Sequence, residues 1–240
     1  MSDEGDGRVV LVTGGTRGIG KACAEAFVAN GDRVAVTYRT SVPENDDVLG
    51  VVCDQADTVQ VDAAFAAIEE ALGPVEVLVA NAGITRDQLV LRMSGDDFAA
   101  VVDTNLTGTY RMVKRAVRGM VRARRGRLIF ISSVVGLLGS AGQVNYAASK
   151  AGLVGMARSL ARELGSRSIT SNVVAPGPVA TDMLAELSED RQSDIAAAIP
   201  LGRFGSPDEI AAAVTFLASA EAGFITGAVL PVDGGLGMGH

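Results

Sequence analysis

Short apolar segments of β-forming composition alternate with helical segments along the chain, and this alternation limits the possible folds more than any other feature. Residues 75–80 read Val-Glu-Val-Leu-Val-Ala, an almost unbroken apolar run. Such runs are typical of strands in a parallel sheet that helices cover on both faces. We predict strands over residues 8–13, 33–38, 50–53, 75–80, 127–132, 169–175 and 228–232. We predict helices over residues 21–27, 59–72, 96–124, 145–164 and 207–219.

The predicted fold class is α/β, a doubly wound parallel sheet with helices on both faces, Rossmann-like, in a single domain over residues 1–240. Right-handed crossovers between the strands produce this arrangement and place ligands at the carboxyl ends of the strands. Residues 1–7 are acidic and polar and are expected to be a disordered N-terminus. Residues 180–204 lack a strand pattern and form either a mobile substrate lid or a pair of surface helices.

Charge and rare residues exclude several classes of function. The net charge of -7 disfavours binding to nucleic acid or to an anionic membrane. The start of the chain lacks the features of a signal peptide and no segment is long enough to cross a bilayer, so we expect a cytoplasmic protein. His240 is the one histidine, which argues against a Ser-His-Asp triad and against histidine-based metal sites. Cys23 and Cys53 show neither metal nor disulfide spacing and are expected to be reduced thiols in or near the core.

A glycine-rich turn follows the first predicted strand and opens the first helix, in the order Thr13-Gly14-Gly15-Thr16-Arg17-Gly18-Ile19-Gly20. Glycines let backbone N–H groups approach a pyrophosphate, and a helix N-terminus favours an anion. The spacing Gly14-x3-Gly18-x-Gly20 differs from the general G-x-G-x-x-G dinucleotide fingerprint. The alternative is a tight turn with a purely structural role, but its place after the first strand favours a cofactor site.

Two arginines favour NADP(H) over NAD as the cofactor. A carboxylate about 20 residues beyond the glycines would bind the ribose hydroxyls of NAD. The second predicted strand ends instead in Thr37-Tyr38-Arg39, and Arg17 lies in the glycine turn. Two guanidinium groups suit a 2′-phosphate. The alternative is that both arginines are only solvated.

Tyr146 and Lys150 are the strongest candidates for acid–base chemistry. Residues four apart share one face of a helix, so the Lys150 ammonium is expected to favour the ionised form of the Tyr146 phenol and to lower its pKa. Ser133, which ends an apolar segment, precedes Tyr146 by 13 residues. Tyr-x3-Lys often arises by chance as an exposed helix pair, so this interpretation depends on the other motifs.

Taken together, these motifs resemble the short-chain dehydrogenase/reductase family from Val9 onwards. The glycine turn, Asn81-Ala82-Gly83, Ser133 and Tyr146-x3-Lys150 match the family pattern, and Asn105 in Asn105-Leu106-Thr107-Gly108 matches its fourth catalytic residue. The resemblance implies hydride transfer from NADPH to a carbonyl. Tyr146 would donate the proton, Ser133 would bind the carbonyl oxygen, Lys150 would hold the nicotinamide ribose, and Asn105 would hold a water.

The resemblance also implies a set of cofactor contacts. Asp54 would meet the adenine, residues 81–83 would line a ribose, and residues 176–181 would bracket the nicotinamide. The full expected set is Gly14, Thr16, Arg17, Gly18, Ile19, Gly20, Arg39, Asp54, Gln55, Asn81, Ala82, Gly83, Tyr146, Lys150, Pro176, Gly177, Val179 and Thr181. Pro178 departs from the family pattern, which more often has a bulky residue there, and this leaves the detail of the pocket open.

Finer motifs, including residues 81–87, 132–136, 145–152 and 232–235, are similar to the 3-oxoacyl-[acyl-carrier-protein] reductases of fatty acid synthesis. This likeness implies a homotetramer that acts on acyl carrier protein. A helical stripe of basic residues offers a surface for that acidic partner, with Arg124 and Arg167 as expected contacts. The stripe consists of Arg111, Arg115, Arg118, Arg122 and Arg125.

Four alternatives remain open from the sequence. The stripe is equally compatible with a solvated or subunit-facing helix surface. The substrate is alternatively acetoacetyl-CoA, or another ketone or polyol. A dinucleotide sensor without catalysis is the alternative of a different class, and the complete catalytic set argues against it.

Overall fold

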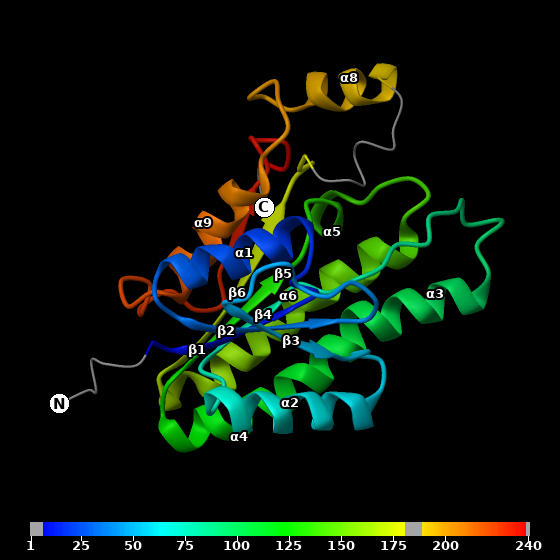
Figure 1. Cartoon of the computed structure of the whole chain (residues 1–240). Coiled ribbons are helices and arrows are strands. Elements are labelled where there is room, and N and C mark those ends of the chain that lie inside the picture. The colour runs from blue at the N-terminus through cyan, green and yellow to red at the C-terminus, as the bar shows by residue number, and fades with distance from the viewer. Residues whose placement is uncertain (1–6, 181–188, 239–240) are drawn as a thin grey trace.

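The computed structural model describes residues 7–180 and 189–238 of the 240-residue chain (Figure 1). These residues form a 7-stranded sheet in the order β3-β2-β1-β4-β5-β6-β7, and every pair of neighbours is parallel. The strands are β1 (Val9–Thr13), β2 (Arg33–Tyr38), β3 (Val48–Val52), β4 (Val77–Ala80), β5 (Gly126–Ile131), β6 (Ile169–Pro176) and β7 (Val229–Val232). All seven predicted strands are present within two residues of their expected ends. Of the expected disordered N-terminus, residues 1–6 lie outside the described part.

Helices cover both faces of the sheet, which confirms the predicted doubly wound fold. Two of them, α1 (Gly18–Ala29) and α9 (Pro207–Ala218), pack against each other on one face, and Figure 1 shows both above the sheet. The opposite face carries α2 (Thr58–Leu72), α4 (Thr109–Ala123) and α6 (Val144–Leu164). Alternate strand residues point to the two faces, so Leu128 and Ile129 belong to separate hydrophobic cores. Cys23 and Cys53 are buried and unpaired, as expected.

The long helix predicted over residues 96–124 is wrong as a single element. The segment contains α3 (Gly95–Val102), a π-helical stretch η1 (Asp103–Gly108) and then α4. Asn105 lies in this π-helical stretch and is buried among polar partners from other parts of the chain. Short π-segments occur often at functional sites, because they reorient one side chain within a helix.

The region after β6, where residues 180–204 were predicted to form a lid or a pair of surface helices, contains one described helix. A helix, α8 (Glu189–Ala198), covers part of residues 180–204, while residues 181–188 lie outside the described part. Val179 and Gly205 form a parallel bridge that closes the base of this excursion. Two further short elements were not expected, α5 (Val135–Leu138) and the 3-10 turn η2 (Gly165–Arg167). One helix, α8, is therefore present in this region, and the choice between a lid and a pair of surface helices stays open.

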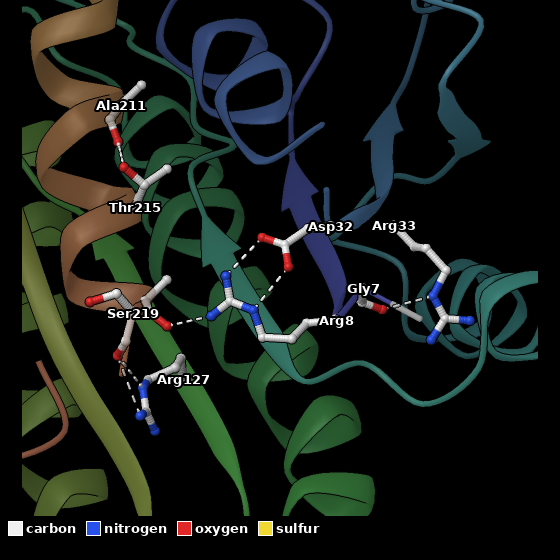
Figure 2. Close-up of polar contacts among 9 residues, drawn as sticks. Gly7, Arg8, Asp32, Arg33, Arg127, Ala211, Thr215 and Ser219 are labelled. Atoms are coloured by element: carbon white, nitrogen blue, oxygen red, sulfur yellow. Dashed lines mark hydrogen bonds and ion pairs between the residues drawn. The ribbon is translucent and has the colours of Figure 1, made fainter. Parts of the chain in front are cut away.

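Both ends of α9 are fixed by polar groups. Ser206 and Glu209 form a capping box at its N-terminus. At its C-terminus the carbonyl of Ala218 accepts a hydrogen bond from Arg8 at 2.6 Å, and the carbonyl of Ser219 lies 3.4 Å from the Arg127 guanidinium (Figure 2). Positive charge at a helix C-terminus is stabilising because it opposes the helix dipole. Within the described residues, no helix is long and apolar enough to cross a membrane.

Candidate active site

The candidate site lies at the carboxyl ends of the strands, where the order of the sheet reverses between β1 and β4. In doubly wound folds this switch point is the usual place for a bound nucleotide. Asn81, just after β4, joins the two strands: its amide donates to the carbonyls of Thr13 at 3.0 Å and Gly14 at 3.1 Å. The Thr13 hydroxyl in turn accepts from the backbone N–H groups of Asn81 and Ala82. The Asn81 side chain therefore secures the glycine turn, and the backbone of residues 81–83 remains to line a cofactor.

The glycine turn has the backbone shape that close approach to a ligand requires. Gly14 and Gly18 have φ angles of 64° and 51°, which side chains other than glycine rarely adopt. A Cβ atom on Gly20 would lie 2.2 Å from the Gly14 carbonyl oxygen. Arg17 is the N-cap of α1 but makes no side-chain cap, and the first turn has no acidic residue. The first N–H groups of α1 thus lack both an intrahelical partner and a side-chain cap.

Arg17, in the glycine turn, and Arg39, after β2, are both exposed. Arg39 follows β2, and its guanidinium lies 3.4 Å from the Asp54 carboxylate, which follows β3. The other Asp54 oxygen accepts from the backbone of Ala56. The structure therefore brings two of the expected adenine-end residues together, with Asp54 as a nearby counter-charge for Arg39.

Gln55 was expected to contact the cofactor, but its amide nitrogen has protein partners. It donates to the carbonyl of Ala82 at 3.1 Å and to the carbonyl of Thr104 at 2.8 Å. Its side chain packs under Gly108, where a Cβ atom would lie 2.8 Å from the Gln55 Cγ. The physical reason is its burial, since a buried amide must find hydrogen-bond partners. Gln55 thus links the loop after β4 to the π-helical stretch.

Ser133 and Tyr146 meet at the carboxyl end of β5. Ser133 follows that strand, and Tyr146 lies in the first turn of α6. A hydrogen bond between the two side chains lowers the pKa of Tyr146, but burial of the phenol is the larger effect and raises it, and the nearby charge of Asp87 adds to the rise. The net result is a phenol with a pKa above its ordinary value. A hydroxyl pair of this kind can bind and protonate one oxygen atom of a ligand.

Lys150 lies beside Tyr146, as its spacing predicts. Its Nζ is 5.6 Å from the centroid of the Tyr146 ring and donates to the carbonyl of Ile131 at 2.8 Å. Burial lowers the pKa of the Lys150 ammonium to about 8. In this arrangement the pKa of Tyr146 is raised rather than lowered, because burial of the phenol outweighs the other effects.

Asn105 is placed by the π-helical stretch against the loop after β4. Its side-chain oxygen accepts from the Ile84 backbone at 2.8 Å, and its amide nitrogen donates to the Ile84 carbonyl and to the Ser149 hydroxyl. Ser149 in turn donates to the Tyr146 carbonyl at 2.8 Å. Both amide hydrogens of Asn105 are therefore used within the protein. A water, as expected from the resemblance, would have only acceptor positions left on this residue.

Sequence reasoning overlooked several buried polar residues that support the site. Ser132 donates to the Lys150 carbonyl at 2.8 Å, and Asn145 donates to the Arg86 carbonyl at 2.9 Å. Gly136 in α5 packs directly on α6, where a Cβ atom would lie 2.9 Å from the Lys150 backbone. Their signal in the sequence is their position: Ser132, Gly136 and Asn145 are polar or small residues that lie in the same motifs as Ser133 and Tyr146.

Residues 176–179, which are expected to bracket the nicotinamide, lie at the end of β6 and directly after it. The Pro176 carbonyl accepts from Val134 at 2.8 Å, and Gly177 donates to the Val232 carbonyl. A Cβ atom on Gly177 would lie 2.7 Å from the Asp233 Cα, so glycine is required there. Val179 is buried, and the carbonyl of Pro178 accepts from Gly205. Thr181 lies outside the described residues.

The arginine stripe on α4 is less positive than its sequence suggests. Arg111 pairs with Asp103 and Arg115 pairs with Glu69, while Arg125 at the end of the helix pairs with Glu76. Arg118 and Arg122 are exposed. Among the described residues, no group of His, Cys, Asp and Glu could hold a metal ion.

Arg124 and Arg167 are neighbours, but not neighbours of Tyr146. Arg124 donates to the carbonyl of Ser166 at 2.9 Å. Arg124 precedes β5 and Arg167 precedes β6, so both lie at the amino ends of the strands. The 21 residues of α6 span about 30 Å between the two edges of the sheet. Within one subunit, the length of α6 therefore separates this patch from Tyr146, and the carrier contact at Arg124 and Arg167 stays a prediction.

Comparisons with known proteins agree with this geometry. A family model described as "Enoyl-(Acyl carrier protein) reductase" matches residues 14–237. A 3-oxoacyl-[acyl-carrier-protein] reductase, MabA, of Mycobacterium tuberculosis is 53% identical over 234 residues, which cover 97% of this chain and 94% of that protein. The 3-oxoacyl-[acyl-carrier-protein] reductase FabG of Escherichia coli is 45% identical over 240 residues, covering 97% and 98%. On these matches, the chain belongs to the short-chain dehydrogenase/reductase family.

Proposed function

We propose that this protein reduces 3-oxoacyl-[acyl-carrier-protein] to 3-hydroxyacyl-[acyl-carrier-protein] with NADPH, as a step of fatty acid biosynthesis. As a member of its family the chain is an oxidoreductase that uses a nicotinamide cofactor. The observation that carries the proposal is the hydrogen-bonded pair of Ser133 and Tyr146 beside the buried Lys150. The names of the relatives from Mycobacterium tuberculosis and Escherichia coli support the choice of substrate.

The carboxyl ends of β1 and β4 suit a dinucleotide. The glycine turn there has a backbone shape that only residues without side chains adopt easily, at Gly14, Gly18 and Gly20. The uncapped first turn of α1 offers N–H donors to a pyrophosphate. We assign NADP(H) rather than NAD(H) because Arg17 in the glycine turn and Arg39 after β2 are both exposed and no acidic residue ends β2.

Tyr146 and Ser133 would share the work at the substrate carbonyl. When bound, the cofactor supplies the hydride that the keto carbon accepts. Ser133 would donate a hydrogen bond to the carbonyl oxygen and stabilise its developing negative charge. Tyr146 would then give its phenolic proton to the same oxygen. Burial keeps the pKa of Tyr146 above its ordinary value, so the phenol is protonated at neutral pH and can act as the donor.

Lys150 and Asn105 would support this proton transfer by Tyr146. The Lys150 amine lies over the Tyr146 ring and is anchored by Ile131, so it can hold a cofactor ribose hydroxyl without moving. With a pKa of about 8, it exchanges protons more readily than an exposed lysine. Asn105 fixes the first turn of α6 through Ser149.

We further propose that the protein is a cytoplasmic homotetramer whose partner is acyl carrier protein. The exposed Arg118, Arg122, Arg124 and Arg167 would attract that acidic partner. Because Arg124 and Arg167 lie at the far edge of the sheet from Tyr146, a carrier bound there would serve the site of a neighbouring subunit. The tetramer and this docking surface thus depend on each other.

The first experiment measures NADPH consumption with an acetoacetyl group on acyl carrier protein and, in parallel, on CoA. We expect a preference for the carrier protein, and a loss of activity of about 100-fold or more in Tyr146→Phe, which lacks the proton donor. The variant should still bind NADPH, as fluorescence titration can check. A preference for CoA would favour acetoacetyl-CoA reduction, and no activity with either thioester would overturn the proposed substrate.

A further inference from the structure

Helix α6 carries two polar pairs with the same four-residue spacing. Tyr146 and Lys150 form one pair, and Asn145 and Ser149 form the other, one position earlier on the helix. Residues four apart share one face of a helix, so each pair forms its own stripe. Asn145 and Ser149 are both completely buried, at 0% exposure. Because buried polar side chains need hydrogen-bond partners, the partners of this second pair show what it holds in place.

The second pair holds the backbone of Tyr146 on both sides. The Asn145 side-chain oxygen accepts from the Tyr146 N–H at 2.8 Å, and the Ser149 hydroxyl donates to the Tyr146 carbonyl at 2.8 Å. The N-cap residue of α6, Gln143, makes no side-chain cap. The first N–H groups of a helix have no intrahelical partner, so the bond to Asn145 satisfies the Tyr146 N–H in place of a cap. Both backbone polar groups of Tyr146 are therefore held by side chains.

Both residues of this pair are also connected to the loop after β4. Asn145 Nδ2 donates to the Arg86 carbonyl at 2.9 Å. Ser149 is connected through Asn105, whose amide donates to the Ser149 hydroxyl at 3.1 Å and to the Ile84 carbonyl at 3.0 Å. The Ile84 N–H donates back to the Asn105 side-chain oxygen at 2.8 Å. The bonds therefore form a closed ring, which runs from the loop to the start of α6, on to Asn105, and back to the loop.

Close packing leaves this hydrogen-bonded ring little room to move. A Cβ atom on Gly83 would lie 3.1 Å from Asn105 Oδ1 and 3.5 Å from Lys150 Nζ. A Cβ atom on Gly152 would lie 2.8 Å from Leu106 Cδ2. The loop therefore lies directly against Lys150, and η1 lies directly against α6. Because protein interiors are close-packed, a shift of one of these elements displaces the others.

We propose that Asn145 and Ser149 are positioning residues for the proton donor: they fix the backbone of Tyr146 to the loop after β4, and with it the place of the phenol. This inference rests on the proposed function for its catalytic meaning. Residues 81–83 of the same loop are expected to line the cofactor, so the hydrogen-bonded ring would set the phenol relative to the cofactor. Proton transfer needs donor and acceptor within hydrogen-bond reach, and a small displacement slows it. Since Asn145 and Ser149 are completely buried, they act through Tyr146 and not by contact with the substrate.

The variant Ser149→Ala removes one hydroxyl from the hydrogen-bonded ring. We expect kcat for thioester reduction to fall by on the order of 10-fold, while the KM for NADPH stays close to that of the wild type. The solvent deuterium isotope effect on kcat should rise, because a displaced phenol makes proton transfer slower and more nearly rate-limiting. Ser159→Ala is the matched control, since the Ser159 hydroxyl on the same helix also donates to a backbone carbonyl, that of Gly155 at 3.0 Å. This control should keep wild-type kinetics.

Amide hydrogen exchange of the complete protein tests the ring without any substrate. The Ile84 N–H donates to Asn105, and the Tyr146 N–H donates to Asn145. Ser149→Ala removes neither of these bonds directly. If the ring acts as one unit, both amides should nevertheless exchange roughly 5- to 10-fold faster in this variant, which corresponds to the loss of about one hydrogen bond. In Ser159→Ala both amides should exchange as in the wild type.

A second variant loosens Tyr146 without removing a bond to Asn105. Asn145→Leu keeps a side chain of similar size that can neither accept from the Tyr146 N–H nor donate to the Arg86 carbonyl. We expect the same fall in kcat and the same rise in the isotope effect, measured per folded enzyme. Agreement between Asn145→Leu and Ser149→Ala would show that the effect acts on Tyr146 and not on Asn105 alone.

The outcomes separate this inference from the proposed function. If both variants lose kcat but keep the wild-type isotope effect, the two residues have only a structural role and the inference fails. If reduction proceeds and Ser149→Ala changes neither the isotope effect nor the exchange of the Ile84 amide, the inference also fails while the proposed function stands. If the amides respond as expected but the wild type reduces neither thioester, the attachment of Tyr146 to the loop stands and the proposed substrate fails.

Discussion

Lys150 is a buried amine that donates a hydrogen bond to the carbonyl of Ile131. Burial lowers its pKa from 10.5 to about 8, while an unfolded chain keeps the amine protonated up to about pH 10.4. Between these two values the unfolded state binds more protons than the folded state, so this group makes stability rise with pH. The cost of the buried ammonium is fully present below pH 8 and disappears above pH 10.5.

A comparison of wild type with Lys150→Met tests this linkage. From pH 7 to pH 10 the wild type should gain stability relative to the variant, by on the order of 3 kcal/mol at most, because methionine has no proton to lose. Urea unfolding followed by circular dichroism at several pH values measures the difference. Stability curves that run parallel across this range would show that the folded protein does not depress the lysine pKa.

At the scale of single elements, the π-helical stretch η1 is the feature that the sequence pattern did not predict. Residues 96–124 have an uninterrupted helical pattern, and their break at Asp103–Gly108 comes from partners far away in the chain. Gln55 bonds to the Thr104 carbonyl, and Ile84 bonds to the Asn105 side chain. Local periodicity contains no information on such long-range bonds. The strands, by contrast, were predicted well because most of them contain a nearly continuous apolar run bounded by turns, as in Val77–Ala80.

The same contrast holds for the candidate site. Motif spacing placed Ser133, Tyr146 and Lys150 together correctly, because two of them share a helix face and the third ends the strand beside it. The protonation of that group was not predictable. Whether a lysine lowers a tyrosine pKa depends on burial and on the direction of the amine, which only the packed structure determines.

The variant Gln55→Leu tests whether the Gln55 side chain stabilises the π-helical stretch. Leucine fills a similar space but leaves the carbonyls of Ala82 and Thr104 without this donor. We expect a loss of roughly 1–3 kcal/mol in the free energy of unfolding and a fall in kcat, because Asn105 follows Thr104 directly. Urea denaturation and steady-state kinetics measure both. Wild-type stability would mean that Gln55 is not a structural bridge.

At the scale of the whole molecule, the two edges of the sheet are chemically distinct. The carboxyl edge holds the glycine turn and Tyr146, while the amino edge holds Arg124 and Arg167. The two edges lie about 30 Å apart along α6, and we propose that a carrier bound at the amino edge serves the site of a neighbouring subunit. Under that proposal, oligomer formation and carrier recognition are one question.

A complementation experiment addresses that question. The double variant Arg124→Ala/Arg167→Ala should lose activity with carrier-bound substrate more than with CoA-bound substrate. When it is mixed and reassembled with Tyr146→Phe subunits, part of the carrier-dependent activity should return, because each mixed oligomer pairs an intact tyrosine with an intact arginine patch. Equal losses on both substrates would exclude the docking surface, and no recovery on mixing would exclude the action between subunits.

Helix α9 has consequences for how this protein can diversify. Its start is fixed by the Ser206–Glu209 capping box, and its end is held by Arg8 and Arg127 from the amino edge of the sheet. One further tie comes from the excursion between β6 and Gly205, because Arg203 pairs with Glu209 of the capping box at 2.7 Å. Exchanges of the exposed residues of α8 touch none of these anchors, whereas a change of Arg203 would loosen the start of α9. For evolution and for enzyme engineers, α8 is therefore the replaceable part of this excursion.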